Sequence, residues 1–438
     1  MKSAMTLTCF VCLALCPTAA AQDRPNVILI MADDLGVEWL GCYGNERHCT
    51  PNLDALAAKG MRFDHCYSTP LCTPSRVAIM TGKYNHRNYD RFGAFPLSHE
   101  ARTFGNLMER AGYATCMAGK WQLGRAKPAA MGFDRSLQYS VNQATQQNYY
   151  WNPTDATIES RIRIDGKRAT DFENDYGPDI VARFITEFID DNSQRPFFVY
   201  YPMLLCHAPF QPTPASTDKD FLDEPKFSNK DKWFEDMVQH IDTIVGRIVE
   251  HLDRTGLREN TLLLFTGDNG SPHTRTRFRD GTYLGQKGRL TNSGTHVPLI
   301  ASWPGTIRSA STCNDLVDFT DFYATFADLV TGEDYAPLDG VSFLPQLRGQ
   351  PGTPREWAFV YYTPNQVGKA GTESKNAYWA RTHRWKLYHD GRLYDMNKDV
   401  RELDPYLPSS DNAEAKTART HLEAAFEKLE VNPEMLQR

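Results

Sequence analysis

Short apolar runs alternate with longer amphipathic stretches along most of the chain, and this alternation constrains the fold more than any other feature. The clearest apolar runs have the length of buried strands and lie at residues 27–31, 114–118, 197–201, 262–265 and 298–302. Stretches with helical spacing or capping residues lie at residues 51–60, 103–112, 178–192 and 231–255. Strands that alternate with helices form a sheet covered on both faces. The sequence therefore predicts an α/β fold, with a large mixed sheet flanked by helices.

The pattern changes near residue 356, where short β-rich runs replace the alternation. These runs lie at residues 358–362, 377–381, 385–389 and 393–395, and a helical stretch follows at residues 413–429. Such a series predicts a small antiparallel sheet closed by a helix. We expect a large N-terminal domain at residues 22–355 and an antiparallel-sheet subdomain at residues 356–438.

The first 21 residues have the pattern of a secretory signal peptide. Lys2 precedes an apolar core at residues 5–15, and Ala19, Ala20 and Ala21 precede Gln22. This core is too short to span a bilayer, and no later segment is apolar enough to do so. We expect residues 1–21 to be cleaved and the mature protein to be exported, either periplasmic or secreted, with no membrane span.

The net charge argues against some binding partners, and the cysteine spacing argues against one kind of metal site. The formal net charge of -6 argues against nucleic acid and anionic membrane surfaces as partners. Seven cysteines follow the predicted signal peptide: Cys42, Cys49, Cys66, Cys72, Cys116, Cys206 and Cys313. They form no CxxC pair, which argues against a structural zinc site. If Cys72 has a chemical role, the other six can form disulfides, and the sequence does not choose among the pairings.

Four of the predicted strands run directly into a polar cluster. The clusters are Asp33-Asp34, Lys120-Trp121-Gln122, Cys206-His207 and Gly267-Asp268-Asn269. In open α/β sheets, ligands bind outside the carboxyl ends of the strands. One cluster alone is compatible with a turn. Four at one edge of the sheet indicate a site.

Two of these clusters offer only carboxylate and amide oxygens, from Asp33, Asp34, Asp268 and Asn269. Oxygen ligands of this kind suit a hard divalent cation rather than zinc. Three carboxylates at adjacent strand ends also repel one another unless a cation lies among them. Either motif alone would be interpreted as a turn, but together they predict a metal site. We expect calcium at this site, with magnesium as the alternative.

The segment Cys72-Thr73-Pro74-Ser75-Arg76 precedes an apolar run that stops at Gly82. Pro74 suits the first turn of a helix, so Cys72 is predicted to lie at the positive helix end, where an anion is favoured. Arg76 has the geometry to hold a tetrahedral oxyanion in bidentate fashion. The alternative is a plain helix start with a buried structural cysteine.

This segment, with Thr81-Gly82 after it, resembles the signature of the sulfatase family, the formylglycine-dependent type I sulfatases of the alkaline phosphatase superfamily. Further matching segments follow in order at residues 31–36, 119–124, 206–209, 266–270, 285–288, 294–299, 303–305 and 393–395. The resemblance implies an alkaline-phosphatase-like sandwich and a sulfuric ester hydrolase.

The resemblance also assigns roles to individual residues. In the family the signature cysteine is oxidised to formylglycine by a maturation enzyme, and the aldehyde hydrate is the nucleophile. Formylglycine at residue 72 would complete the metal shell of Asp33, Asp34, Asp268 and Asn269. Asp268 would accept the proton of the nucleophile, Lys120 and Lys287 would neutralise the sulfate oxygens, and His207, with Lys287, would protonate the departing alcohol. Without the resemblance, the lysines could be surface charges and His207 a half-buried, hydrogen-bonded histidine.

Substrate contacts are predicted from two places. Gln122 stands where many sulfatases carry a histidine that helps to expel sulfate, and glutamine cannot take a proton there. Residues 271–289 are rich in basic side chains against the single acid Asp280, which favours an anionic substrate such as a sulfated carbohydrate. We expect Gln122, His273 and Arg289 to contact it. Tyr149, Tyr150 and Trp151 either stack on a sugar or pack in the fold.

Two other functions remain open at this point. One is hydrolysis of phosphate or phosphonate esters by the same superfamily fold and metal site. The other is glycan binding without catalysis, which the presence of Cys72, Arg76 and all four metal ligands argues against and only Gln122 favours.

Overall fold

The computed structural model describes residues 24–89, 92–139, 150, 162–169, 172, 175–217, 230–279, 281–330, 338–363 and 377–432. The predicted signal peptide lies outside these residues. Within the described part of the chain, no helix has the length and apolar character needed to cross a membrane.

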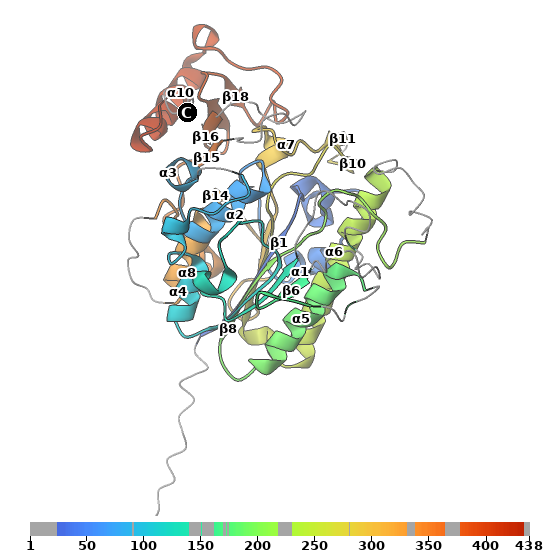
Figure 1. Cartoon of the computed structure of the whole chain (residues 1–438). Coiled ribbons are helices and arrows are strands. Elements are labelled where there is room, and N and C mark those ends of the chain that lie inside the picture. The colour runs from blue at the N-terminus through green and yellow to red at the C-terminus, as the bar shows by residue number, and fades with distance from the viewer. Residues whose placement is uncertain are drawn as a thin grey trace, which may run out of the picture.

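A ten-stranded mixed sheet forms the centre of the molecule (Figure 1), in the order β13-β2-β12-β9-β1-β8-β4-β5-β6-β7. The strands are β1 (Asn26–Ala32), β2 (Met61–Phe63), β4 (Ala114–Lys120), β5 (Arg135–Tyr139), β6 (Ile162–Ile164), β7 (Lys167–Arg168), β8 (Phe197–Pro202), β9 (Thr261–Gly267), β12 (Leu299–Ser302) and β13 (Ser311–Cys313). The central strands β9, β1, β8 and β4 are parallel, and every residue in them is buried. Burial on both faces explains why these strands are continuous apolar runs in the sequence.

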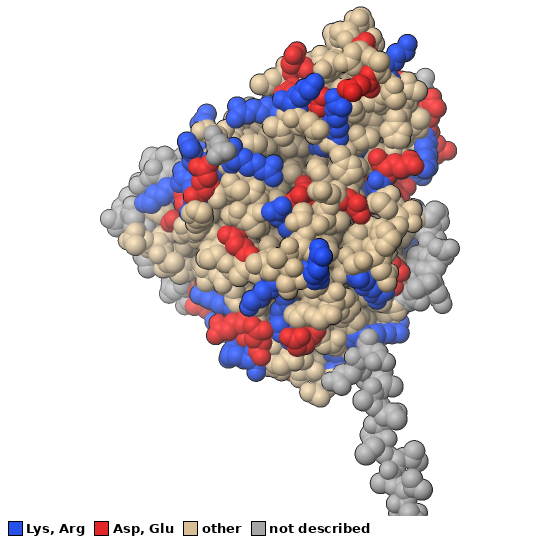
Figure 2. All heavy atoms as spheres, turned by 180° about the vertical axis from the view of Figure 1, so that it is seen from behind, with Lys and Arg blue, Asp and Glu red and all other residues tan. Residues whose placement is uncertain are grey.

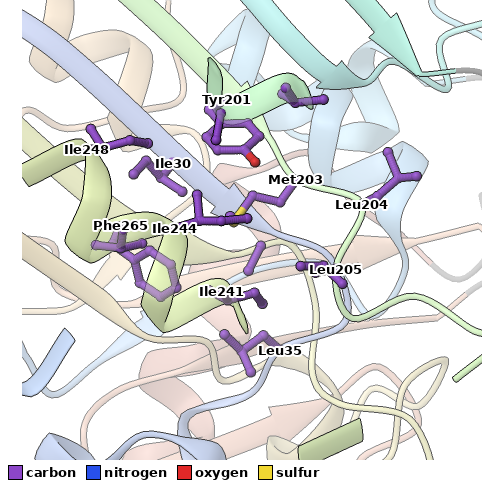
Figure 3. Close-up of a cluster of buried hydrophobic side chains, with 14 of the residues drawn as sticks. Ile30, Leu35, Tyr201, Met203, Leu204, Leu205, Ile241, Ile244, Ile248 and Phe265 are labelled. Carbon is purple, nitrogen blue, oxygen red and sulfur yellow. The ribbon is translucent and has the colours of Figure 1, made fainter. Parts of the chain in front are cut away.

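Helices cover both faces of this sheet. One face carries α1 (Pro51–Ala58), α5 (Gly177–Asp191) and α6 (Lys230–Arg254), and the other carries α2 (Cys72–Thr81), α4 (Phe104–Arg110) and α8 (Asp321–Val330). Because side chains alternate along a strand, β1 sends Ile30 to the first face and Leu29 to the second. Figure 3 shows Ile30 beside Ile244 and Ile248 of α6. The predicted α/β sandwich is confirmed.

A second, four-stranded antiparallel sheet follows near the C-terminus. It consists of β15 (Ala358–Tyr362), β16 (Ala377–Arg381), β17 (Trp385–Tyr388) and β18 (Leu393–Asp395) in that order. Helix α10 (Ala413–Lys428) packs on it through Leu422 and Ala425. We call β15–β18, α10 and the described segments that connect them the C-terminal unit. The predicted sheet and closing helix are confirmed, whereas the domain boundary at residue 356 stays a prediction.

Shorter elements connect the two parts. These are β3 (Cys66–Tyr67), α3 (Asn85–Asn88), the hairpin of β10 (Arg275–Phe278) and β11 (Gly281–Leu284), α7 (Asn292–Thr295), β14 (Val317–Asp318) and α9 (Leu344–Leu347). The hairpin and α7 lie next to the C-terminal unit in Figure 1. On the face seen in Figure 2, basic and acidic side chains are interspersed rather than gathered by sign.

The seven cysteines that follow the predicted signal peptide all carry free thiols in the described chain. Six are buried and Cys42 is half-buried. Disulfides among the six cysteines other than Cys72 were left open by the sequence, and the structure pairs none of them. Burial raises the pKa of each thiol, which favours its protonated form.

Candidate active site

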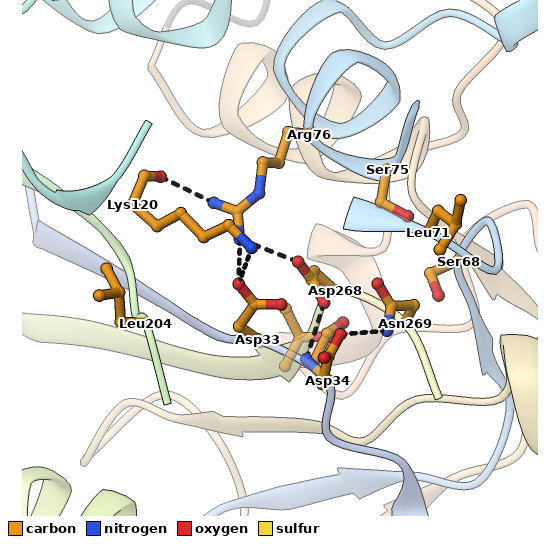
Figure 4. Close-up of polar contacts among 12 residues, drawn as sticks. Asp33, Asp34, Ser68, Leu71, Ser75, Arg76, Lys120, Leu204, Asp268 and Asn269 are labelled. Carbon is orange, nitrogen blue, oxygen red and sulfur yellow. Dashed lines mark hydrogen bonds and ion pairs between the residues drawn. The ribbon is translucent and has the colours of Figure 1, made fainter. Parts of the chain in front are cut away.

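The polar clusters that follow β9, β1, β8 and β4 meet at the carboxyl edge of the central sheet. The backbone joins them: Asp33 N donates to Leu205 O (2.8 Å), and Asp268 N donates to Ala32 O (2.8 Å). Figure 4 shows Asp33, Lys120 and Asp268 pointing toward one another. Four segments far apart in the sequence therefore form one cluster, because neighbouring parallel strands end on the same side.

Three carboxylates form the centre of this cluster. Ligand oxygens of Asp33, Asp34 and Asp268 all lie within 4.8 Å of one another, and the three residues are at most 1% exposed. Asp34 has a positive φ of 61°, and its backbone N donates to Asp268 Oδ1 (3.0 Å). This turn directs two consecutive aspartates into one buried space.

Two oxygens of the cluster are buried without a hydrogen-bond donor among the described residues, Asp33 Oδ1 and Asn269 Oδ1. Asn269 uses its Nδ2 to donate to Asp34 Oδ1 (2.8 Å) and to Gly270 O (2.9 Å), so its amide oxygen stays available. A buried oxygen without a donor costs about 1–3 kcal/mol. Carboxylates with an unsatisfied amide oxygen fit a hard divalent cation, so the donor set matches the predicted metal site.

Arg76 and Lys120 surround the first of these carboxylates. Lys120 Nζ pairs with Asp33 Oδ2, and Arg76 Nη2 donates to Asp268 Oδ2 (2.8 Å) and lies 3.4 Å from Asp33 Oδ2. Arg76 Nη1 donates to the carbonyl of Lys120 (2.8 Å). The sequence predicted bidentate contact between Arg76 and an oxyanion. Both of its Nη atoms instead bind protein oxygens, because α2 docks with this side chain beneath the carboxylates.

Lys287 balances the second aspartate, with its Nζ 2.6 Å from Asp34 Oδ2. The sequence analysis missed Ser271, which supports this arrangement. Ser271 is fully buried; its Oγ accepts from Gly36 N (2.9 Å), and its carbonyl accepts from Lys287 N (2.9 Å). It thereby ties the loops that follow β1 and β9 to Lys287. Its position two residues after Asn269 is the only signal in the sequence.

The charges in this site shift the carboxyl pKa values in opposite directions. Burial alone would raise the pKa of Asp33, but the surrounding cations, led by Lys120, bring it below its usual range. Burial, with repulsion from Asp33 and Asp268, raises the pKa of Asp34 to about 7 despite Lys287. Burial and Asp33 raise the pKa of Asp268 to about 6. The protein alone therefore does not keep all three carboxylates ionised at neutral pH.

Cys72 is the first residue of α2, as predicted, and is 1% exposed. Burial raises the pKa of its thiol, while Lys120 and Lys287 act in the opposite direction. The preceding loop is fixed by Ser75, whose Oγ donates to Thr69 O (3.1 Å). Cys72 thus lies in the electrostatic field of the same lysines that pair with the aspartates.

His207 and Gln122 lie on the loops after β8 and β4, and both are half-buried. His207 Nδ1 lies 2.6 Å from Ala208 O and donates to it, which leaves Nε2 as the titrating nitrogen. Burial, then Lys120 and Lys287, lower the pKa of His207 well below its usual value. Gln122 has a φ of 51°, and its Oε1 is buried without a hydrogen-bond partner among the described residues.

The remaining predicted substrate contacts lie farther along the chain. His273 is exposed before β10, and Arg289 is half-buried between Lys287 and α7. Of the predicted aromatic residues, Tyr150 is fully buried and donates to Leu204 O (3.1 Å). It therefore packs in the fold and does not stack on a sugar. Tyr149 and Trp151 lie outside the described residues.

Known proteins resemble this chain over nearly all of its length. Residues 25–332 match the family model described as Sulfatase, and residues 285–432 match the model described as N-sulphoglucosamine sulphohydrolase, C-terminal. Arylsulfatase A of Homo sapiens is 32% identical over 411 residues, covering 86% of this chain and 77% of the relative. N-acetylglucosamine-6-O-sulfatase of Bacteroides thetaiotaomicron is 26% identical over 499 residues, covering 91% of this chain and 85% of the relative.

A solved structure shares the fold of this chain. A solved structure of a protein in complex with its substrate, D-glucosamine-2-N,6-O-disulfate, superposes with a TM-score of 0.76 at 23% identity, covering 95% of this chain and 100% of that one. Among the segments that carry the sequence resemblance, residues 31–36, 119–124, 266–270 and 285–288 contribute to the carboxylate cluster, and residues 72–76 begin α2. The chain belongs to the sulfatase family of sulfuric ester hydrolases.

Proposed function

We propose that this protein removes sulfate from a sulfated carbohydrate, using formylglycine derived from Cys72 and one divalent cation. The observation that carries the proposal is the buried cluster of carboxylates and lysines whose charges act on Cys72. The carbohydrate is supported by relatives, one named an N-acetylglucosamine-6-O-sulfatase and one bound to a disulfated glucosamine. The protein would be exported to the periplasm or secreted, and a formylglycine-generating enzyme would mature it.

The cation would be held by Asp33, Asp34, Asp268 and Asn269, together with the modified residue 72. Calcium is proposed first and magnesium second, since both bind oxygen ligands. When bound, the cation would lower the pKa of the attacking hydroxyl and offset the charge of the sulfate. The hydrate of formylglycine would supply that hydroxyl, and Asp268 would accept its proton.

Two lysines would bind the sulfate group. Lys120 and Lys287 carry their ammonium groups at the edge of the carboxylate cluster, with side chains only 4% and 18% exposed. In so little solvent, a positive charge stabilises developing negative charge far more than it does in water. Arg76 acts as a positioning residue, because it holds Asp33 and Asp268 in place.

His207 would deliver the proton to the departing alcohol, with Lys287 as a second candidate. In the free protein the imidazole is neutral, because burial and the two lysines disfavour its charge. A bound sulfate ester adds negative charge beside the ring, which raises its pKa and favours a proton on Nε2. The contact from Nδ1 to Ala208 O fixes the ring orientation for this transfer.

The reaction is tested by sulfate release from glucosamine 6-sulfate beside phosphate release from the matched 6-phosphate. Protein made with its maturation enzyme should release sulfate, and Cys72→Ala should fall to the background rate. Cys116→Ala removes another buried thiol, on β4, and should keep the activity. Faster release of phosphate would support the phosphate hydrolase instead, and full activity in Cys72→Ala would contradict the nucleophile.

Sugar recognition is tested separately. We propose that Gln122, His273 and Arg289 contact the carbohydrate. Alanine at His273 or Arg289 should then reduce kcat/KM for a carbohydrate sulfate more than for a small aryl sulfate. Equal losses on both substrates would contradict this assignment.

A further inference from the structure

A pocket of about 420 Å³ lies between the β10–β11 hairpin, the segment around β3 and the C-terminal unit. Its lining contains none of the residues proposed to bind the metal, the sulfate or the sugar. Six basic side chains contribute to it: His65, Arg279, His296, Arg381, His383 and Arg401. Arg401 Nη2 also donates to Thr282 O (3.0 Å), which ties the C-terminal unit to the hairpin.

The charge of this pocket is strongly positive. The one described acidic residue in its lining, Asp64, is paired with Arg62, whose Nε lies 2.9 Å from Asp64 Oδ1. Within the described residues, no ion pair joins Arg279, Arg381 or Arg401 to a carboxylate. Three guanidinium groups thus line one pocket, and none of them is paired with a carboxylate of the described chain.

Arg381 is the most buried of the three, at 3% exposure. Its contacts are neutral: Nη1 donates to Asn292 Oδ1 (3.0 Å), and Nη2 donates to His383 O (3.0 Å). Its guanidinium lies over the Tyr67 ring at 4.5 Å. A buried cation without a counter-ion costs free energy, so a negatively charged ligand here would be stabilised. The contacts also hold the guanidinium in one orientation.

The positive charge of this pocket also affects the ionisation of His65. His65 lies 5.1 Å from His383 and 6.4 Å from His296, ring centre to ring centre. Burial, followed by the charge of Arg381, lowers the pKa of His65 to about 3. Burial also lowers the pKa of His296 well below its usual value, so the His65 and His296 rings are polar but uncharged in the free protein.

We propose that this pocket binds a sulfate group at a second site, separate from the reacting centre, between Arg279, Arg381 and Arg401. Guanidinium groups match a tetrahedral oxyanion with paired N–H donors. The group is either free inorganic sulfate or a further sulfate ester on a carbohydrate chain. The proposal concerns binding alone and does not depend on the reaction proposed above.

Isothermal titration calorimetry tests this with the full chain carrying Cys72→Ala, which prevents turnover. Inorganic sulfate and a heparin tetrasaccharide are titrated in separate experiments at one low chloride concentration. The test variant adds Arg279→Gln and Arg401→Gln, whose side chains are both exposed. The matched control adds Arg275→Gln and Arg277→Gln, which remove two positive charges from β10, outside the pocket.

We expect the parent and control proteins to bind a sulfate group in this pocket, and the test variant to bind it at least about tenfold more weakly. Weaker binding of inorganic sulfate by the test variant identifies a site for the free anion. Weaker binding of the tetrasaccharide alone identifies a site for a sulfate ester on a carbohydrate chain. Unchanged stoichiometry and affinity for both ligands would overturn the proposal. If the double variant melts earlier than the control, Arg279→Gln alone replaces it, with a severalfold loss expected.

Discussion

Removing the divalent cation should destabilise the protein, and the resulting decrease in the free energy of unfolding should become larger as the pH rises. In the metal-free protein, burial raises the pKa of Asp34 to about 7 and that of Asp268 to about 6. In the unfolded chain both titrate near 3.9, as aspartates ordinarily do, so the folded state binds more protons between these values. In the metal-free protein, the contribution of these two carboxyl groups to the free energy of unfolding is therefore fully present below about pH 4. This contribution is lost as the pH rises through 7. A bound cation keeps the carboxylates ionised and removes this dependence.

The size of the effect follows from the shift at Asp34, from 3.8 to about 7. At 1.36 kcal/mol per pKa unit, this shift is worth about 4 kcal/mol. Because Asp34 and Asp268 influence each other, we assign this value to the cluster and do not add a second one. For a chain of 438 residues, with an unfolding entropy near 2.1 cal/mol/K per residue, it corresponds to about 4 °C in Tm.

Differential scanning calorimetry measures the effect, with calcium or with a chelator, at a series of pH values. The difference in Tm between the two conditions should be near zero at about pH 4 and reach about 4 °C at pH 8. Asp34→Asn should flatten the pH dependence of the metal-free protein. A difference that does not change with pH, or no difference at pH 8 with either calcium or magnesium, would refute the reasoning.

Two further predictions concern stability. Gly267→Ala places a Cβ 2.0 Å from Leu35 O and should lower the free energy of unfolding, measured by urea denaturation, by about 3 kcal/mol. The control Gly281→Ala, whose Cβ would meet no atom nearer than 3.9 Å apart from its chain neighbours, should lower it by under about 1 kcal/mol. Equal urea midpoints for the two variants would contradict the close packing of Gly267 against Leu35. Glu402→Gln removes the negative charge that lies 2.9 Å from the buried Lys386 ammonium and should cost about 3–5 kcal/mol. Adding Lys386→Met should recover part of that loss, and no recovery would argue against the ion pair.

The central strands could be predicted from the sequence because both of their faces are buried. β1 extends one residue beyond the predicted run at each end, and β9 extends by one or two. β2 and β13 were not predicted, since three-residue strands are too short to show a periodic pattern. Their position depends on pairing with distant segments, which no local pattern encodes.

The site was predictable to the extent that strand ends define it. Asp33 and Asp268 follow the adjacent strands β1 and β9, and Lys120 ends β4 in the same parallel part of the sheet, so their proximity follows from topology. The contacts of Arg76 were not predictable, because the direction of a long side chain depends on how α2 docks against the sheet. The basic pocket was also missed, although Arg279 belongs to a segment noted for its charge. Its other arginines lie in the C-terminal unit, and only the docking of that unit brings them together.

The central claim is that residue 72 is a formylglycine nucleophile, and tandem mass spectrometry tests it most directly. Trypsin releases residues 63–76 as one peptide, in which fragmentation separates Cys72 from Cys66. Protein made in its native host should carry an aldehyde or its hydrate at residue 72 and an unmodified thiol at residue 66. An unmodified thiol at residue 72, with the maturation enzyme shown to be active in that host, would contradict the account.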